Sequence, residues 1–281
     1  MAQAMIQVEN LSKHFARKSG MWGDSSSVVK AVDDVSFEIA EGEVLGLVGE
    51  SGSGKSTTGR LILRLIEPNA GRVLYSGKNV FDLSKSDLRE LRKKMQIVFQ
   101  DPYGAFNPRM TVGAILGEAL QLRGVSTRNE RDAEARKFLE MVQMPNSILG
   151  RYPHEFSGGQ RQRIGIARAL AVEPKFIVAD EPVSALDVST QAEIVNLLLD
   201  LQQRLNLTML FISHDLSVVK VLCDRVAVMQ SGKLVEVGTS EQIYNAPQQQ
   251  YTRDLLAAIP IPDPQRAKRE PAVREPVVTA T

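Results

Sequence analysis

One short stretch of the sequence combines glycine, lysine and hydroxyl residues at a spacing that indicates a chemical role. In order, its residues are Gly49, Glu50, Ser51, Gly52, Ser53, Gly54, Lys55, Ser56 and Thr57. Two glycines separated by four residues, then lysine and a hydroxyl residue, form the pattern of a phosphate-binding loop. Glycine lets backbone N–H groups turn toward an anion, Lys55 can reach the outer phosphates, and Ser56 can be a ligand of Mg²⁺. We therefore expect a binding site for a nucleotide polyphosphate.

Such a loop lies between a strand and a helix, and the flanking sequence supplies both. Residues 43–48 include an apolar run typical of a buried parallel strand. Residues 56–67 are predicted to form a helix that ends at Pro68, because proline cannot continue a helix. The loop would then receive the partial positive charge of a helix N-terminus, which favours bound anions.

A pair of carboxylates follows an apolar stretch later in the chain. Residues 176–179 are all apolar and predict a buried strand, and Asp180 and Glu181 come directly after it. A nucleotide-hydrolysing site needs a carboxylate on a neighbouring strand to hold Mg²⁺, and Asp180 is the candidate. Glu181 would orient and polarise the attacking water. The alternative is a pair of exposed acids that happens to end a strand.

The composition argues against several classes of protein. The 281 residues include 34 basic and 33 acidic side chains, so no overall positive charge points to a nucleic-acid partner. Cys223 is the single cysteine, which excludes an internal disulfide and suits a reducing compartment such as the cytoplasm. The N-terminus lacks the apolar region of a signal peptide, and no apolar stretch reaches the roughly 18 residues of a membrane helix. Work at a membrane would need other subunits.

Strands and helices are predicted to alternate along most of the chain. We expect strands over 6–11, 35–40, 71–76, 95–99, 176–179, 208–212 and 225–229, with a polar loop over 17–27. We expect further helices over 85–94, 112–123, 129–142, 160–170 and 191–204. The predicted fold class is α/β, with a mostly parallel core sheet, a small N-terminal β layer and a helical subdomain inserted at about 111–170.

The most specific segment is YPHEFSGGQRQRIGIARAL, which covers residues 152–170. It resembles the signature region of ABC-transporter ATPases, which are P-loop NTPases with an antiparallel N-terminal β layer and which use ATP and Mg²⁺. Phe156 stands where many members carry leucine. The resemblance implies that this segment closes over ATP held by another subunit, so that a head-to-tail dimer encloses two ATP molecules. A hydroxyl, glycine amides and a helix N-terminus would form this second anion site, from Ser157, Gly158, Gly159 and Gln160.

Other landmarks of the family match residue by residue. Gln100 corresponds to the glutamine that senses Mg²⁺ and the γ-phosphate, and His214 corresponds to the switch histidine that contacts the γ-phosphate. Residues 184–187 correspond to the loop that crosses the dimer interface. Phe15 corresponds to the aromatic residue that stacks on adenine. The alternative for Phe15 is a surface phenylalanine packed on its neighbours, with Trp22 as a less favoured substitute for the adenine contact.

The resemblance covers residues 5–260, which we expect to form one ABC ATPase domain followed by a flexible tail over 261–281. The loop before Val35, residues 99–112 and residues 244–260 resemble ATPases of oligopeptide and dipeptide importers, a group that includes nickel and glutathione importers. In this chain two glutamines, at positions 249 and 250, stand where His-Pro is common. Some subunits of the group carry a cysteine-rich cluster, which a chain with one cysteine cannot form.

The resemblance also implies a cellular setting. The chain would be the ATP-hydrolysing subunit of an importer, lying peripherally on the cytoplasmic face of the inner or plasma membrane. Its partners would be two membrane-spanning permease subunits, an extracytoplasmic solute-binding protein and a second ABC ATPase subunit, either identical or related. No nucleic acid is expected as a partner.

Two other classes of function remain open at this point. A soluble ABC ATPase that acts on nucleic acid or ribosomes shares these motifs, although such proteins typically carry a coiled-coil insertion, zinc-binding cysteines or two tandem cassettes. A nucleotide-binding regulator without turnover would share the phosphate loop but would have no need of Glu181.

Overall fold

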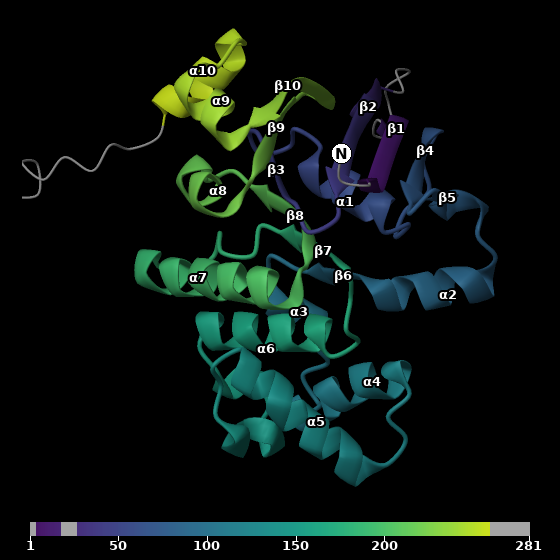
Figure 1. Cartoon of the computed structure of the whole chain (residues 1–281), viewed down its shortest axis with the longest axis vertical. Coiled ribbons are helices and arrows are strands. Elements are labelled where there is room, and N and C mark those ends of the chain that lie inside the picture. Colours follow the sequence, from purple (N-terminus) through teal and green to yellow (C-terminus); the bar gives the residue numbers. More distant parts are fainter. Residues whose placement is uncertain (1–3, 18–26, 259–281) are drawn as a thin grey trace, which may run out of the picture.

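The computed structural model describes residues 4–17 and 27–258. Most of the polar loop predicted over 17–27, with Trp22, and the tail predicted over 261–281 lie outside these described residues. Figure 1 shows two sheets in the upper half of the molecule and a group of helices in the lower half.

The larger sheet has six strands in the order β10-β9-β3-β8-β7-β6. The strands are β3 (Val44–Val48), β6 (Met95–Val98), β7 (Phe176–Asp180), β8 (Thr208–Ser213), β9 (Arg225–Gln230) and β10 (Lys233–Thr239). Neighbouring strands from β9 to β6 are parallel, whereas β10 at the edge pairs antiparallel with β9. Every residue of β3, β7 and β8 is buried, which explains why these strands are apolar along nearly their whole length instead of alternating.

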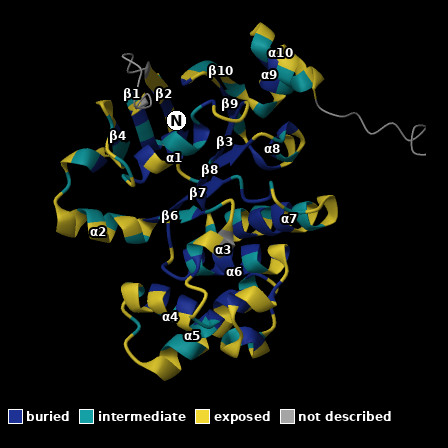
Figure 2. Cartoon of the chain, turned by 180° about the vertical axis from the view of Figure 1, so that it is seen from behind, coloured by how far each residue is buried: buried dark blue, intermediate teal, exposed yellow. Residues whose placement is uncertain are grey.

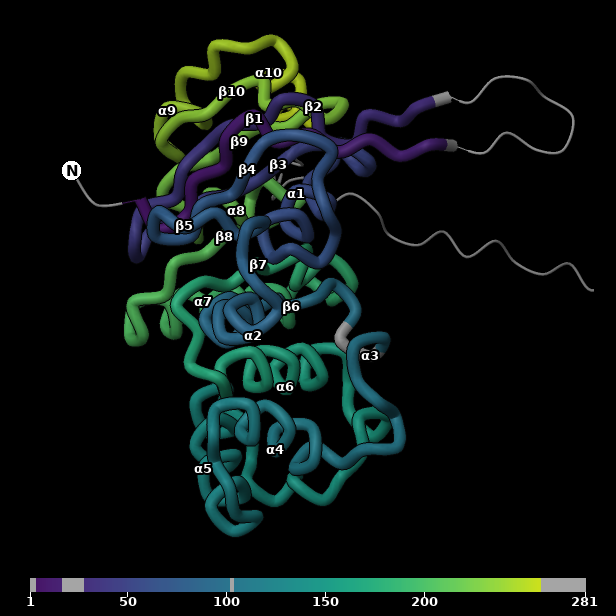
Figure 3. Tube along the Cα trace, turned by 90° about the vertical axis from the view of Figure 1, so that its right-hand side faces the viewer, coloured from purple at the N-terminus to yellow at the C-terminus, as the bar shows by residue number. Residues whose placement is uncertain are grey.

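The N-terminal part of the chain forms a separate antiparallel sheet in the order β2-β1-β4-β5. Its strands are β1 (Ala4–Arg17), β2 (Ser27–Ala40), β4 (Ala70–Tyr75) and β5 (Lys78–Asn79). β1 and β2 are longer than the predicted strands 6–11 and 35–40, because they keep pairing past several register shifts. In Figure 3 the ends of these two strands extend together away from the two sheets.

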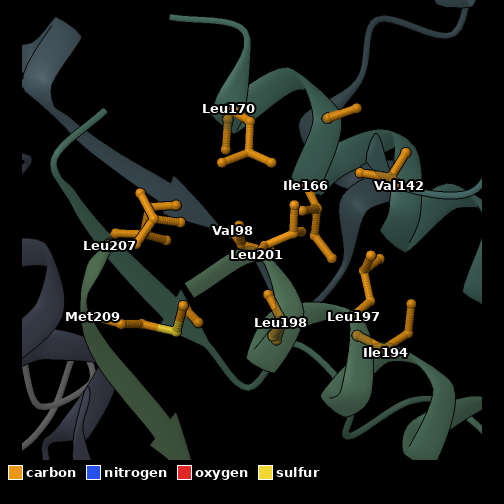
Figure 4. Close-up of a cluster of buried hydrophobic side chains, with 14 of the residues drawn as sticks. Val98, Val142, Ile166, Leu170, Ile194, Leu197, Leu198, Leu201, Leu207 and Met209 are labelled. Carbon is orange, nitrogen blue, oxygen red and sulfur yellow. The ribbon is translucent and has the colours of Figure 1, made fainter. Parts of the chain in front are cut away.

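Two hydrophobic cores lie on opposite faces of the six-stranded sheet. Successive side chains of a strand point to opposite faces, and β8 illustrates the alternation. Leu210 and Ile212 belong to one core, which α1 (Lys55–Ile62) and the antiparallel sheet cover. Met209 and Phe211 belong to the other, which α6 (Gly158–Leu170), α7 (Val188–Leu205) and α8 (Leu216–Leu222) cover. Figure 2 shows the buried strands between these layers, and Figure 4 shows the second core where α6 and α7 meet the sheet.

The chain between β6 and β7 is helical, as predicted. It forms α3 (Pro102–Ala105), α4 (Val112–Arg123), α5 (Arg128–Met141), two short 3₁₀ turns (Asn146–Gly150 and Pro153–Glu155) and α6. Thr111, Thr127 and Ser157 cap α4, α5 and α6, because each side-chain oxygen accepts a backbone N–H of the first turn. The helix predicted over 85–94 is also present, as α2 (Lys85–Lys94).

Several elements were not predicted from the sequence. These are β5, β10, the short helices α3 and α8, and two C-terminal helices, α9 (Ser240–Asn245) and α10 (Gln250–Ala257). β10 alternates poorly between apolar and polar residues, and most of these helices are shorter than the length at which helical periodicity can be recognised.

The prediction for the helix after the phosphate loop was wrong at its C-terminal end. α1 ends at Ile62 and does not continue to residue 67, and Arg64 has a left-handed backbone with φ 47°. The Arg64 guanidinium donates hydrogen bonds to the carbonyl oxygens of Val80 (2.9 Å) and Leu83 (3.0 Å). The helix ends because Arg64 takes the left-handed conformation, so that the N–H of Leu65 donates to the carbonyl oxygen of Arg60 at 2.8 Å and closes the last turn before Pro68 is reached.

Candidate functional site

The phosphate loop joins β3 to α1, as its spacing predicted. Gly54 caps α1 with φ 109°, and Lys55 begins the helix. The Lys55 side chain is buried at 4% exposure, and its Nζ donates to the carbonyl oxygens of Gly49 and Glu50, both at 2.7 Å. The ammonium group therefore lies inside the curve of the loop.

Two glycines of this loop are required by close packing. A Cβ on Gly49 would collide with the carbonyl oxygen of Met229, and a Cβ on Gly54 would collide with that of Ala31. Gly52, by contrast, has open space where its Cβ would be. The loop is thus fixed against β9 and β2 on its inner side and open to a ligand at its middle.

Asp180 lies at the end of β7, beside the phosphate loop. The hydroxyl of Ser56 donates to its Oδ1 at 2.7 Å. Burial raises the pKa of Asp180, while the Ser56 hydrogen bond opposes this shift. Burial lowers the pKa of Lys55, because it disfavours the charged form of a base as it does that of an acid, and the nearby carboxylates of Glu181 and Asp180 oppose that shift. The hydroxyl and carboxylate oxygens are the donors that Mg²⁺ prefers, so the residues present fit this ion.

Glu181 follows in an unusual backbone conformation that directs its side chain. Its φ is 49°, in the left-handed region, where few residues other than glycine are found. Its N–H donates to the carbonyl oxygen of Ile212 at 2.9 Å, and its own carbonyl accepts from the N–H of Ser184 at 3.3 Å. These bonds hold the conformation. As a result, Oε2 of Glu181 lies 3.3 Å from Nδ1 of His214, which follows β8.

One open cavity of about 460 Å³ brings part of the predicted set together, whereas Asp180 and His214 do not line it. From the predicted set, it is lined by Ser51, Gly52, Gly54, Lys55, Ser56, Thr57, Gln100 and Glu181. Sequence reasoning missed four further lining residues, which are Val29, Lys30, Ala31 and Ser231. They come from β2 and from the turn between β9 and β10, and no local pattern in the sequence marks them because only the tertiary fold brings them to the loop.

Phe15 does not line this cavity but lies next to it. It is half-exposed, at 44%, and it is the direct cross-strand partner of Val29, which does line the cavity. Opposite residues of an antiparallel pair project on the same face of the sheet, so Phe15 and Val29 share one face.

The signature segment lies at the N-terminus of α6 and forms no part of the cavity lining. Ser157 caps the helix, because its Oγ accepts from the N–H of Gln160 at 3.3 Å, and Oε1 of Gln160 accepts from the N–H of Ser157 at 3.1 Å. Gly158 is exposed, whereas Gly159 is buried against Thr190 of α7. Ser157, Gly158 and Gln160 are thus exposed at the start of α6, and none of them lines the cavity beside the chain's own phosphate loop.

The segment over 184–187 leads into α7. Asp187 caps that helix by accepting from the N–H of Thr190 at 3.0 Å, and hydrogen bonds from Ser189 and Thr190 hold the pKa of Asp187 well below its usual range. The carboxylate is consequently ionised at physiological pH and committed to this cap.

Comparison with known proteins identifies the family. A family model described as ABC transporter matches residues 32–184. The chain belongs to the ABC transporter family. Binding of a nucleotide and ATP hydrolysis coupled to transport are therefore its activity, and the α/β P-loop NTPase fold predicted from the sequence is confirmed.

Individual ABC relatives match nearly the whole chain. The oligopeptide transport ATP-binding protein OppF of Bacillus subtilis is 51% identical over 283 residues, which cover 98% of this chain and 90% of OppF. The dipeptide transport ATP-binding protein DppF of Lactococcus lactis subsp. cremoris is 53% identical over 276 residues, which cover 97% of this chain and 86% of DppF. A solved dimeric ATP-binding cassette bound to ADP and Pi is similar with a TM-score of 0.74 and 31% identity, over 84% of this chain and 99% of that one.

None of the helices within residues 4–17 and 27–258 combines the length and the apolar character that a membrane span requires.

Proposed function

We propose that this ABC ATPase powers the import of oligopeptides, dipeptides or similar small solutes. The observation that carries the proposal is the single cavity in which Lys55, Ser56, Gln100 and Glu181 meet. These four residues come from α1, from the chain after β6 and from the chain after β7. A cavity with these groups can bind a triphosphate, hold a divalent cation and direct a water at the γ-phosphate.

Nucleotide binding would begin at the phosphate loop. We assign contacts with the phosphates to Gly49, Glu50, Ser51, Gly52, Ser53, Gly54, Lys55, Ser56 and Thr57. The buried Lys55 ammonium attracts an anion more strongly than an exposed lysine does, because fewer water molecules screen it. We assign stacking on adenine to Phe15, whose cross-strand partner Val29 lines the same cavity.

The divalent cation would be held by Ser56, Asp180 and Gln100, of which Ser56 and Gln100 line the cavity and Asp180 accepts a hydrogen bond from Ser56. Their oxygen atoms match the ligand preference of Mg²⁺. When bound there, the ion would neutralise charge on the phosphates and orient the leaving group.

Hydrolysis would use the residues that end β7 and β8. The oxygen of the attacking water would bond to the γ-phosphorus, and Glu181 would accept the proton that this water loses. The bond between the γ-phosphorus and the bridging oxygen of the β-phosphate would break in the same step. The products are ADP and phosphate. His214, 3.3 Å from Glu181, would bind the γ-phosphate and keep the carboxylate in place.

We propose that the natural assembly contains two ABC ATPase subunits, identical or related. Ser157, Gly158, Gly159 and Gln160 would bind the γ-phosphate held by the partner subunit. This is supported by the outward position of the segment, outside its own chain's cavity. It is also supported by the dimeric state of the similar cassette.

The cargo and the remaining partners follow from the relatives. OppF and DppF are named as ATP-binding proteins of oligopeptide and dipeptide transport, and both match this chain over nearly its full length. We therefore propose two membrane-spanning permease subunits and an extracytoplasmic solute-binding protein as partners, with this chain peripheral on the cytoplasmic face of the membrane. We also propose residues 5–260 as one ATPase domain, with the segment 111–170 as its helical subdomain.

One experiment tests both the site and the direction of transport. The chain is assembled with its permease subunits in proteoliposomes, and ATP hydrolysis and uptake of a labelled dipeptide or oligopeptide are measured with the binding protein present. We expect wild type to accumulate peptide. Lys55→Ala should reduce hydrolysis and uptake by about 10²-fold or more, because a desolvated cation facing the phosphates is lost.

The matched control is Lys85→Ala, which removes an exposed lysine at the start of α2. It should retain both activities. Near-normal hydrolysis by Lys55→Ala would contradict the site, and ATP-dependent efflux of peptide would contradict import.

A further inference from the structure

The C-terminal helix α10 contacts the phosphate loop, although 201 positions separate them in the sequence. The hydroxyl oxygen of Tyr251, in the first turn of α10, accepts a hydrogen bond from the backbone N–H of Glu50 at 3.3 Å. None of the roles considered so far uses Tyr251. The contact lies toward the β10 edge of the core sheet, where α9 and α10 lie above that sheet in Figure 1.

The bonded N–H belongs to a peptide group that Lys55 holds at its other end. The carbonyl oxygen of Gly49 and the N–H of Glu50 are parts of one planar unit. Nζ of Lys55 donates to that carbonyl oxygen at 2.7 Å, while the N–H faces Tyr251. Any rotation of this peptide plane would break both bonds together, so Tyr251 fixes the orientation of a group that in turn fixes the Lys55 ammonium.

Tyr251 itself is held firmly by the structure around it. The Glu236 carboxylate of β10 accepts from the N–H groups of Gln248 (2.7 Å) and Gln249 (3.1 Å), directly before α10. Thr252 is buried at 1% exposure, and the ring of Tyr251 packs against the larger hydrophobic core. Burial raises the pKa of Tyr251, so its hydroxyl is neutral at physiological pH and able to accept the Glu50 hydrogen bond.

The preceding helix adds a second anchor. The Tyr244 hydroxyl of α9 donates to the carbonyl oxygen of Leu216, which begins α8 directly after the turn that carries His214. Lys220 of α8 lies 5.4 Å from the centre of the Tyr244 ring. The contacts of Tyr244, Gln248 and Gln249 therefore anchor α9 and the start of α10 to α8 and β10.

We infer that Tyr251 is a positioning residue for ATP binding, which acts by holding the peptide group between Gly49 and Glu50 in the orientation that presents Lys55 to the phosphates. The inference rests on the proposed nucleotide site and adds the C-terminal helix to it. It also explains how the segment over 244–260, which resembles a subgroup of ABC ATPases, serves a site at the other end of the chain.

The test is Tyr251→Phe, which removes the hydroxyl and keeps the ring in the core. A hydrogen bond between neutral groups contributes modestly, so the dissociation constant and KM for MgATP should rise about 2- to 10-fold. The kcat at saturating ATP should stay within about twofold, because Tyr251 touches no reacting atom. Amide exchange of the Glu50 N–H, followed by NMR, should accelerate, whereas the thermal midpoint should barely move. A purely structural role would lower the thermal midpoint without this split between KM and kcat.

The matched control is Tyr75→Phe, the same chemical change at a half-buried tyrosine of β4 outside the cavity lining. It should leave the affinity for MgATP and the Glu50 exchange rate unchanged. Unchanged affinity in Tyr251→Phe, or an equal loss of affinity in Tyr75→Phe, would overturn the inference. The proposed site is judged separately by Lys55→Ala, so a null result for Tyr251→Phe beside a large loss for Lys55→Ala would remove only the role of Tyr251.

Discussion

Asp180 and Glu181 are adjacent carboxylates, yet their surroundings suit them to different tasks. Asp180 is buried at 6% exposure and bonded to Ser56, and burial raises its pKa, whereas a bound cation would favour its ionised form. Glu181 turns away on a left-handed backbone toward His214 and lines the open cavity. One carboxylate thus faces the Ser56 hydroxyl and the other faces the space where a water would attack.

Replacing Glu181 should therefore stall the chemistry without preventing binding. Glu181→Gln keeps the shape and hydrogen bonding of the side chain but removes the group that accepts a proton. A positioned general base contributes about 10²–10⁴-fold, so kcat for ATP hydrolysis should fall by that factor while the dissociation constant for MgATP stays within a few-fold. Phosphate release and equilibrium binding of a fluorescent ATP analogue measure the two quantities.

The informative comparison is Asp180→Asn at the neighbouring position. Because Asp180 is the proposed ligand of Mg²⁺, this variant should need a higher Mg²⁺ concentration for half-maximal binding of ATP, and Glu181→Gln should not. Hydrolysis at the parent rate by Glu181→Gln, or an equal Mg²⁺ dependence in both variants, would exclude the division of roles.

At the scale of elements, prediction from sequence worked where the signals were local. The strand before the phosphate loop is apolar along its length, and the helix after Ser157 begins with a capping residue and glutamine three positions later, so β3 and α6 were found with nearly their full extent. The end of α1 was missed because Arg64, and not a glycine, takes the left-handed conformation that closes the helix, so no residue type marks this end in the sequence. The lining residues Val29 to Ala31 were missed because only the tertiary fold brings β2 to the phosphate loop.

The contact between α6 and α7 is such a non-local feature, and it can be tested through Gly159. A Cβ at this position would collide with the Thr190 methyl group, which the Asp187 cap holds in place. Gly159→Ala should therefore lower the free energy of unfolding by about 1–3 kcal/mol, as overpacking of a close contact does. Urea denaturation measures this change.

A second glycine gives the control with the opposite sign. Gly117 lies inside α4, and its nearest neighbour for an added Cβ is Arg131 at 4.0 Å. Gly117→Ala should raise the free energy of unfolding by about 0.5–1 kcal/mol, because alanine loses less conformational freedom in a helix. Equal effects of the two substitutions would mean that Gly159 is not packed against Thr190 as described.

At the scale of the whole molecule, the two segments that we propose as anion sites, the phosphate loop and the Ser157 segment, do not share a cavity. The phosphate loop lines the cavity, whereas the Ser157 segment begins α6 and lies outside the cavity lining. A single nucleotide cannot satisfy both sites on one chain. Two chains placed head to tail would bring each phosphate loop to the partner's α6, and each γ-phosphate would then bond to both subunits.

This arrangement predicts that the protein dimerises with ATP and that a variant with slow hydrolysis accumulates as the dimer. With MgATP, Glu181→Gln should elute from size-exclusion chromatography as a dimer, alone or mixed with its natural partner subunit, because unhydrolysed γ-phosphates keep bridging the subunits. Adding Ser157→Arg should abolish the dimer and leave ATP binding to the monomer intact, since a bulky cation fills the site for the partner's phosphate. Ser126→Arg, in the exposed loop between α4 and α5, controls for the added charge and should still dimerise. A dimer that persists with Ser157→Arg, or a Glu181→Gln protein that stays monomeric beside its natural partner, would show that the Ser157 segment does not act on a second subunit's nucleotide.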